Sequence, residues 1–76
     1  MTETTLSLAA MHRIIEKAGA DRVSESACEE LAGVLEEVGL KIGSNAIDFA
    51  MHAGRKTVKG RDVKIAAQKI TNSTVR

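Results

Sequence analysis

The chain has 76 residues, which is enough for one small domain. Its hydrophobic content of 43% is too high for a disordered tail, and its charged content of 28% is too high for a membrane span. The single cysteine, Cys28, excludes an intrachain disulfide framework and is typical of a reducing compartment. Glu3 stands where a signal peptide would carry a base, so we expect a cytosolic protein.

The net charge of +1 conceals a separation of charge along the chain. The formal charge is 0 over residues 1–24, −5 over residues 25–54 and +6 over residues 55–76. A basic last third is typical of a protein that binds a polyanion, whereas overall near-neutrality argues against a large uniform field.

The small size of the chain predicts a partner subunit. With one Phe and no Trp or Tyr, each core side chain buries modest area. Domains below about 80 residues usually need disulfides, a metal or oligomerisation to reach adequate stability. A disulfide is excluded and no metal-ligand spacing is present, so we expect an obligate dimer.

The first predicted helix covers about residues 8–18. Apolar residues recur there at helical spacing, at Leu8, Met11, Ile15 and Ala18. Gly19 follows as the expected C-terminal cap.

The second predicted helix is long, about 27 residues or 40 Å. Ser24 is its expected N-cap, Ser26 with Glu29 offers a second possible start, and Gly54 ends it. Two apolar lines run along this segment, which predicts that other helices cross it on more than one side. Its three internal glycines suit close crossing; they are Gly33, Gly39 and Gly43.

A third helix is predicted over about residues 60–70. Asp62 lies near its start, where an acid complements the helix dipole. Its apolar face is formed by Val63, Ala66, Ala67 and Ile70. Residues 71–74 show no periodicity, and we expect them to fray. The plan is all-α: short helix, loop, long helix, loop, short helix.

Four segments carry a family resemblance: RII at 13–15, AGADRVS at 18–24, HAGRKTVK at 52–59 and DV at 62–63. In order and spacing they resemble an archaeal histone over about residues 8–70. The resemblance implies one histone-fold domain in residues 1–76, with a core at about 8–70, a frayed N-terminus and a C-terminal tail at 71–76. Two chains would form an intertwined head-to-tail dimer, in which each loop pairs with the partner's other loop as a short β-bridge.

The resemblance also implies sequence-independent binding of double-stranded DNA. Dimers would wrap DNA through phosphate and minor-groove contacts and assemble into nucleosome-like or superhelical particles. The positions that match the family's DNA contacts are Arg13, Arg22, Lys56, Thr57 and Lys59. Arg22 is the expected minor-groove arginine. Any one of these bases alone would more often be a solvated surface charge, so the interpretation depends on the set.

Further matching positions imply roles in loop shape and assembly. Arg55 and Asp62 match a salt bridge that fixes the second loop; the alternative is two exposed charges. Phe49, His52 and Asp62 match a contact between dimers, although His52 alone would equally suit an exposed histidine at a helix end. Gly19 matches a small residue that permits close stacking of superhelix turns.

We do not expect an enzyme. The candidate groups His12, Cys28 and His52 lie far apart in the sequence and lack a third orienting group. No catalytic or metal site, cofactor, small-molecule substrate or membrane is implied. The expected partners are double-stranded DNA and a second copy of the chain, in an obligate homodimer that forms tetramers or polymers on DNA, or another histone.

Several residues depart from the family pattern; among them, Met51 and Glu16 stand where a base is frequent, and Arg61 where an acid is common. The low net charge keeps a second hypothesis open. The chain would then be a histone-fold interaction or capping subunit that serves as a heterodimer partner, regulates transcription and binds DNA weakly. Retention of the DNA-contacting set favours the packaging hypothesis, with the protein in the cytoplasm and associated with the chromosome.

Overall fold

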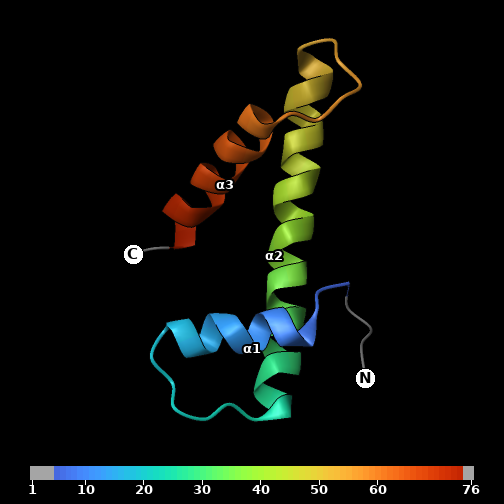
Figure 1. Cartoon of the computed structure of the whole chain (residues 1–76). Coiled ribbons are helices and arrows are strands. Elements are labelled where there is room, and N and C mark those ends of the chain that lie inside the picture. The colour runs from blue at the N-terminus through green and yellow to red at the C-terminus, as the bar shows by residue number, and fades with distance from the viewer. Residues whose placement is uncertain (1–4, 75–76) are drawn as a thin grey trace. The chain divides into compact units, whose positions relative to one another are not determined.

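The computed structural model describes residues 5–74, with side chains to residue 70, and contains three helices (Figure 1). They are α1 (Leu8–Lys17), α2 (Glu25–His52) and α3 (Gly60–Thr74). The described residues include no strand, which confirms the all-α class. The chain divides into two compact units, Met1–Val38 and Gly39–Arg76, and α2 contributes to both. Residues 1–4 of the predicted frayed N-terminus and residues 75–76 of the predicted tail lie outside the described residues.

Local sequence signals determine both ends of α1. The Ser7 hydroxyl caps its N-terminus by accepting a backbone hydrogen bond. At the other end the N–H of Gly19 donates to the carbonyl of Glu16 at 2.9 Å, and the N–H of Ala20 donates to that of Ile15 at 3.4 Å. This is a Schellman motif, and Gly19 has the positive φ, 118°, that the motif requires. The predicted cap at Gly19 is confirmed.

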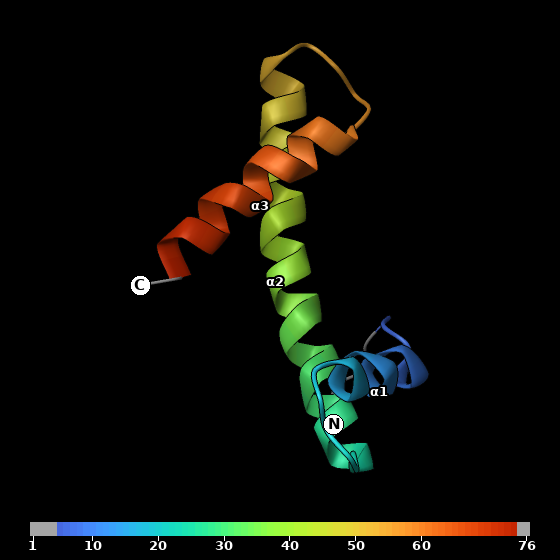
Figure 2. The same ribbon diagram turned by 60° about the vertical axis from the view of Figure 1, so that its left-hand side comes forward.

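In the first unit, α1 lies across the N-terminal part of α2 (Figures 1 and 2). Met11 of α1 is buried against Cys28 and Ala32 of α2. Four partly buried side chains surround them: Leu6, Ala10, Val23 and Leu31. Cys28 is therefore a small buried hydrophobic residue.

The start of α2 resolves the choice between its two predicted N-caps. The Ser24 hydroxyl accepts a hydrogen bond from the N–H of Ala27 at 3.1 Å, so Ser24 is the cap. Ser26 lies inside the helix, and its hydroxyl is 3.2 Å from that of Ser24. The helix has 28 residues, close to the predicted length.

A second Schellman motif ends α2. The N–H of Gly54 donates to the carbonyl of Met51, and the N–H of Arg55 donates to that of Ala50, both at 2.9 Å. Gly54 has a φ of 75°, which an L-residue adopts only with strain. The chain therefore turns at a fixed angle into the second loop, and the backbone of Arg55 is held at the end of the helix.

In the second unit, α3 lies beside the C-terminal part of α2 (Figures 1 and 2). Ala46 and Ala50 of α2 and Ala66 of α3 are buried. The backbone of α3 continues to Thr74, which includes residues that we expected to fray. Residues 71–74 contain neither Gly nor Pro, the two residues that most disfavour a helical backbone.

A single chain leaves much of the predicted apolar surface uncovered. Leu40 and Met51 are 67% and 66% exposed, and Ile14 is 47% exposed. Other exposed large apolar residues are Leu8, Val34, Leu35, Val38, Ile47, Val58, Val63 and Ile65. No helix in the described part of the chain is long and apolar enough to cross a membrane.

Candidate nucleic-acid interface

The second loop is organised around the side chain of Arg55. Its Nη1 and Nη2 donate to Oδ2 and Oδ1 of Asp62, each at 3.0 Å, in a bidentate ion pair. Nη1 also donates to the backbone carbonyl of Thr57 at 2.9 Å. Because the backbone of Arg55 is held by the Schellman motif of α2, one residue connects the end of α2, the middle of the loop and the start of α3.

Asp62 is the acceptor that holds this arrangement together. Its side chain lies in the first turn of α3, and the residue is only 3% exposed. The hydrogen bonds from Arg55 and from the backbone N–H of Lys59 lower the pKa of Asp62 to about 2. The same hydrogen bond to Asp62 raises the pKa of Arg55. Both groups are therefore charged at neutral pH.

The contact with Lys59 also starts α3. The N–H of Lys59 donates to Oδ2 of Asp62 at 2.8 Å, which satisfies a backbone donor just before the helix. This is the acid at the third helical position that the sequence predicted, but in the structure it also accepts the guanidinium of Arg55. The loop and the helix start thus share one carboxylate.

Three of the predicted DNA-contacting residues project from this braced loop. Lys56, Thr57 and Lys59 are all exposed, while the carbonyl of Thr57 and the N–H of Lys59 are held from within. The backbone between α2 and α3 is therefore fixed, and the polar side chains of the loop face solvent. Such an arrangement presents cationic groups to an anionic surface at low entropic cost.

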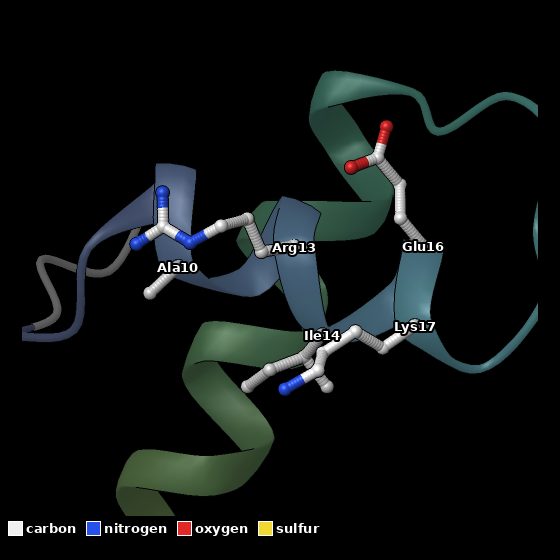
Figure 3. Close-up of a pocket in the computed structure, with 5 residues that line it drawn as sticks. All are labelled: Ala10, Arg13, Ile14, Glu16 and Lys17. Atoms are coloured by element: carbon white, nitrogen blue, oxygen red, sulfur yellow. The ribbon is translucent and has the colours of Figure 1, made fainter.

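The other two predicted DNA-contacting residues belong to the unit Met1–Val38. Arg22 is exposed in the loop between α1 and α2. Arg13 is exposed on α1 and lines a surface depression (Figure 3). The residues that line it are Ala10, Arg13, Ile14, Glu16 and Lys17.

Figure 3 shows two cationic side chains along this depression, because those of Arg13 and Lys17 both run back along α1. The carboxylate of Glu16 points away from them, and it lies 3.4 Å from Nδ1 of His12. Lys17 was not among the predicted contacts. The sequence already indicated that Lys17 shares a helix face with Arg13, because residues four apart on a helix lie on the same side.

The residues predicted to join dimers lie near the end of α2. His52 is exposed, and its Nδ1 lies 2.8 Å from the carbonyl oxygen of Asp48. A carbonyl can only accept, so Nδ1 carries a proton and Nε2 is left for another partner. Phe49 is half-buried, with the ammonium of Lys69 5.8 Å from its ring centroid.

Both the predicted contact between dimers and the predicted salt bridge require hydrogen-bond acceptor sites on the carboxylate of Asp62. Within one chain, Oδ2 accepts two hydrogen bonds and Oδ1 accepts one. A carboxylate oxygen offers two acceptor sites, so Oδ1 retains one for a further donor. The structure joins Asp62 to Arg55, and the hydrogen bond of His52 goes to its own helix.

The candidate catalytic groups do not assemble into a site. Cys28 is buried in the core of the first unit, His12 pairs with Glu16, and His52 bonds to its own helix. Over residues 5–74 no group of three or more His, Cys, Asp or Glu side chains is placed to hold a metal ion.

Comparison with known proteins gives a consistent result. Residues 4–67 match the family model described as histone-like transcription factor (CBF/NF-Y) and archaeal histone. The chain is 52% identical over 63 residues to one subunit of the archaeal histone HAN1 of Thermococcus zilligii, covering 83% of this chain and 94% of that protein. It is also 52% identical over 61 residues to the probable archaeal histone 3 of Methanocaldococcus jannaschii, covering 80% and 91%.

Proposed function

Because the chain belongs to the family of archaeal histones and histone-like transcription factors, we propose that it wraps double-stranded DNA by sequence-independent contacts. Archaeal histones are structural DNA-packaging proteins, they are not enzymes, and they are associated with chromatin in the cell. In this chain the contacting residues would be Arg13, Arg22, Lys56, Thr57 and Lys59. The protein would accordingly lie on the chromosome in the cytoplasm.

The observation that carries this proposal is the braced second loop. Arg55 and Asp62 hold the loop in one conformation, and the side chains that remain outside are two lysines and a threonine. Backbone recognition of DNA needs cationic groups at fixed positions and no base-specific donors. Arg22 of the first loop would enter the minor groove, where an arginine is attracted by the enhanced negative potential.

The working unit would be an intertwined head-to-tail homodimer of the single histone-fold domain, residues 1–76 with its core at about 8–70. The exposed apolar residues of α2 support this, because a second copy would cover surface that one chain leaves in water. In such a dimer the first loop of one chain would pair with the second loop of the other, which would place Arg22 beside Lys56 and Thr57.

Dimers would assemble further on DNA through Phe49, His52 and Asp62. The remaining acceptor site on Oδ1 of Asp62 suits a donor from Nε2 of a partner's histidine. Because Nδ1 of His52 already donates to a carbonyl, Nε2 can donate only when the imidazole is protonated. Gly19, which is exposed after α1, would let successive turns of a superhelix stack closely.

The salt dependence of binding to a short random-sequence duplex tests the DNA-contacting set. About six phosphate contacts per bound unit predict a log–log slope near −5. Replacing Lys56 by Gln should weaken binding to all sequences alike and reduce the magnitude of the slope by about 1 per lost contact. Lys41→Gln is the matched control, because Lys41 is an exposed base in the acidic segment. An equal effect of both substitutions would contradict the assignment of Lys56.

A second candidate is a histone-fold subunit that pairs with another histone and binds DNA weakly. The net charge of +1 and the designation of one relative as a subunit favour it. Sedimentation equilibrium of the purified chain separates the two. A stable homodimer is expected from our proposal, and a chain that stays unfolded or monomeric until another histone is added would support the second candidate.

A further inference from the structure

The start of α3 carries two bases for which the proposed DNA contacts give no role. Arg61 and Lys64 are exposed and lie three residues apart on α3, on the side away from the buried Ala66, and the exposed Ile65 lies next to Arg61 on that side. Neither forms a salt bridge with another residue in the described part of the chain. The side of α3 away from Ala66 therefore carries two exposed bases that form no salt bridge in the described part of the chain.

The two bases at the start of α3 follow directly on the exposed bases of the second loop. From residue 56 to residue 64 the exposed charged residues are all basic, and they are Lys56, Lys59, Arg61 and Lys64. The one acid in this stretch, Asp62, is buried and neutralised by Arg55. The ion pair thus removes the only negative charge that would otherwise offset the bases.

Arg61 occupies a position that disfavours a base. It is the second residue of α3, where the positive end of the helix dipole repels a cation and an acid would be favourable. Its charge interacts with Asp62, but Arg55 already pairs with that carboxylate, so a base at this unfavourable position indicates a role outside the fold. Its charge also helps to lower the pKa of Asp62, after the hydrogen bonds from Arg55 and Lys59.

We propose that Arg61 and Lys64 extend the DNA-contacting surface of the second loop along the outer face of α3, where each meets a backbone phosphate. This inference rests on the proposed DNA binding. From Lys59 to Lys64 the helix axis advances by about 7.5 Å. Duplex DNA carries one phosphate charge per about 1.7 Å of its axis, so a stripe of this length meets phosphates in any sequence register. The ligand is the phosphodiester backbone, and no base edge is read.

The test uses a random duplex just long enough for one bound dimer, titrated across a salt series. The double variant Arg61→Gln, Lys64→Gln should reduce the magnitude of the log–log slope by about 0.9 for each phosphate contact that is lost. Lys41→Gln is the control and should leave the slope unchanged.

Arg61→Glu separates a binding defect from a folding defect. The helix dipole favours an acid at the second position of α3, whereas the loss of the positive charge beside Asp62 is unfavourable, so thermal stability should change little while DNA binding weakens. If binding and the thermal midpoint fall together, the substitution acts on the fold and the inference is wrong.

The remaining outcomes distinguish the inference from the function on which it rests. A wild-type chain with no salt-dependent binding overturns both. A steep wild-type slope that the double variant retains overturns the inference alone. If that variant instead loses only its assembly on long DNA, the inference is also wrong, and Arg61 and Lys64 contact a neighbouring copy, for which the exposed acids Glu29, Glu30 and Glu37 offer a complementary face.

Discussion

At the residue scale, Asp62 is the only charged side chain that is buried in the described part of the chain. A buried carboxylate is tolerated only when it is paired and hydrogen-bonded. The guanidinium fork of Arg55 and the N–H of Lys59 satisfy it, so the charge is retained without a proton. The main effect of the Arg55–Asp62 ion pair is on the conformation of the second loop. By holding Arg55 against the carbonyl of Thr57, the pair fixes the backbone that carries Lys56 and Thr57.

The lowered pKa of Asp62 predicts an acid dependence of stability. Its folded-state pKa of about 2 lies below the ordinary value of about 3.9, so its contribution is fully present above pH 4 and is lost as the pH falls towards 2. Asp62→Asn should therefore be less stable than wild type at neutral pH, and the difference should shrink between pH 4 and pH 2. Urea midpoints measured across this range give the comparison. A difference that stays constant with pH would contradict the role of the ionised carboxylate.

At the element scale, the same device ends two helices. α1 and α2 both close with a Schellman motif whose glycine has positive φ, Gly19 in one and Gly54 in the other. These ends position the two loops that carry the proposed DNA contacts, so the direction of each loop is determined by a backbone conformation. Space is not the constraint, because no atom lies within 4 Å of a Cβ built on Gly54.

This geometry predicts opposite effects for two Gly→Ala substitutions. Gly54→Ala should cost about 1–2 kcal/mol of stability, because an L-residue is strained in the left-handed conformation. Gly33→Ala should instead raise stability by up to about 1 kcal/mol, because Gly33 lies inside α2 and no atom of its own chain within 4 Å opposes a methyl group there; a loss of stability would place a crossing helix of the partner at Gly33. Denaturant unfolding of both variants at equal protein concentration provides the measurement. If both substitutions changed the free energy of unfolding equally and in the same direction, the positive φ of Gly54 would have no effect on stability, which would contradict this account.

Much of the element plan was predictable from single residues, since Ser24, Gly19 and Gly54 act through local hydrogen bonds that the sequence determines. The bracing of the second loop was less accessible. The sequence suggested that Arg55 and Asp62 could pair, but the bond from Arg55 to the carbonyl of Thr57 depends on the path of the loop. The start of α3 at residue 60 was predicted, but its C-terminal end was missed, because apolar periodicity reports packing and a helical backbone can continue beyond its packed face.

At the scale of the whole molecule, the described part of one chain forms a small core in each of its two units. Its buried apolar residues are mostly alanines, and none of its large side chains is fully buried. Large apolar residues such as Val38 and Leu40 remain exposed on α2. Because the folding free energy of small domains is marginal, folding and dimerisation should be coupled, so that thermal midpoints rise with protein concentration.

The proposed contact between dimers predicts a selective defect. His52→Ala should leave the dimer intact, since His52 is exposed and bonds only to its own helix among the interactions described. The length of DNA that the protein protects from nuclease should fall, because dimers could no longer join through Nε2. Sedimentation of the free protein, run in parallel, verifies the dimer. Protection of the wild-type length by the variant would refute a role for His52 in assembly.

The central claim is that the chain packages DNA by assembling on it through backbone contacts. The most direct measurement is binding of the purified wild-type protein to random-sequence duplexes of increasing length, each across a salt series. We predict steep, sequence-indifferent salt dependence, and affinity that tightens in steps as each duplex accommodates another dimer. Binding that stays weak at low salt and is independent of duplex length would contradict the account.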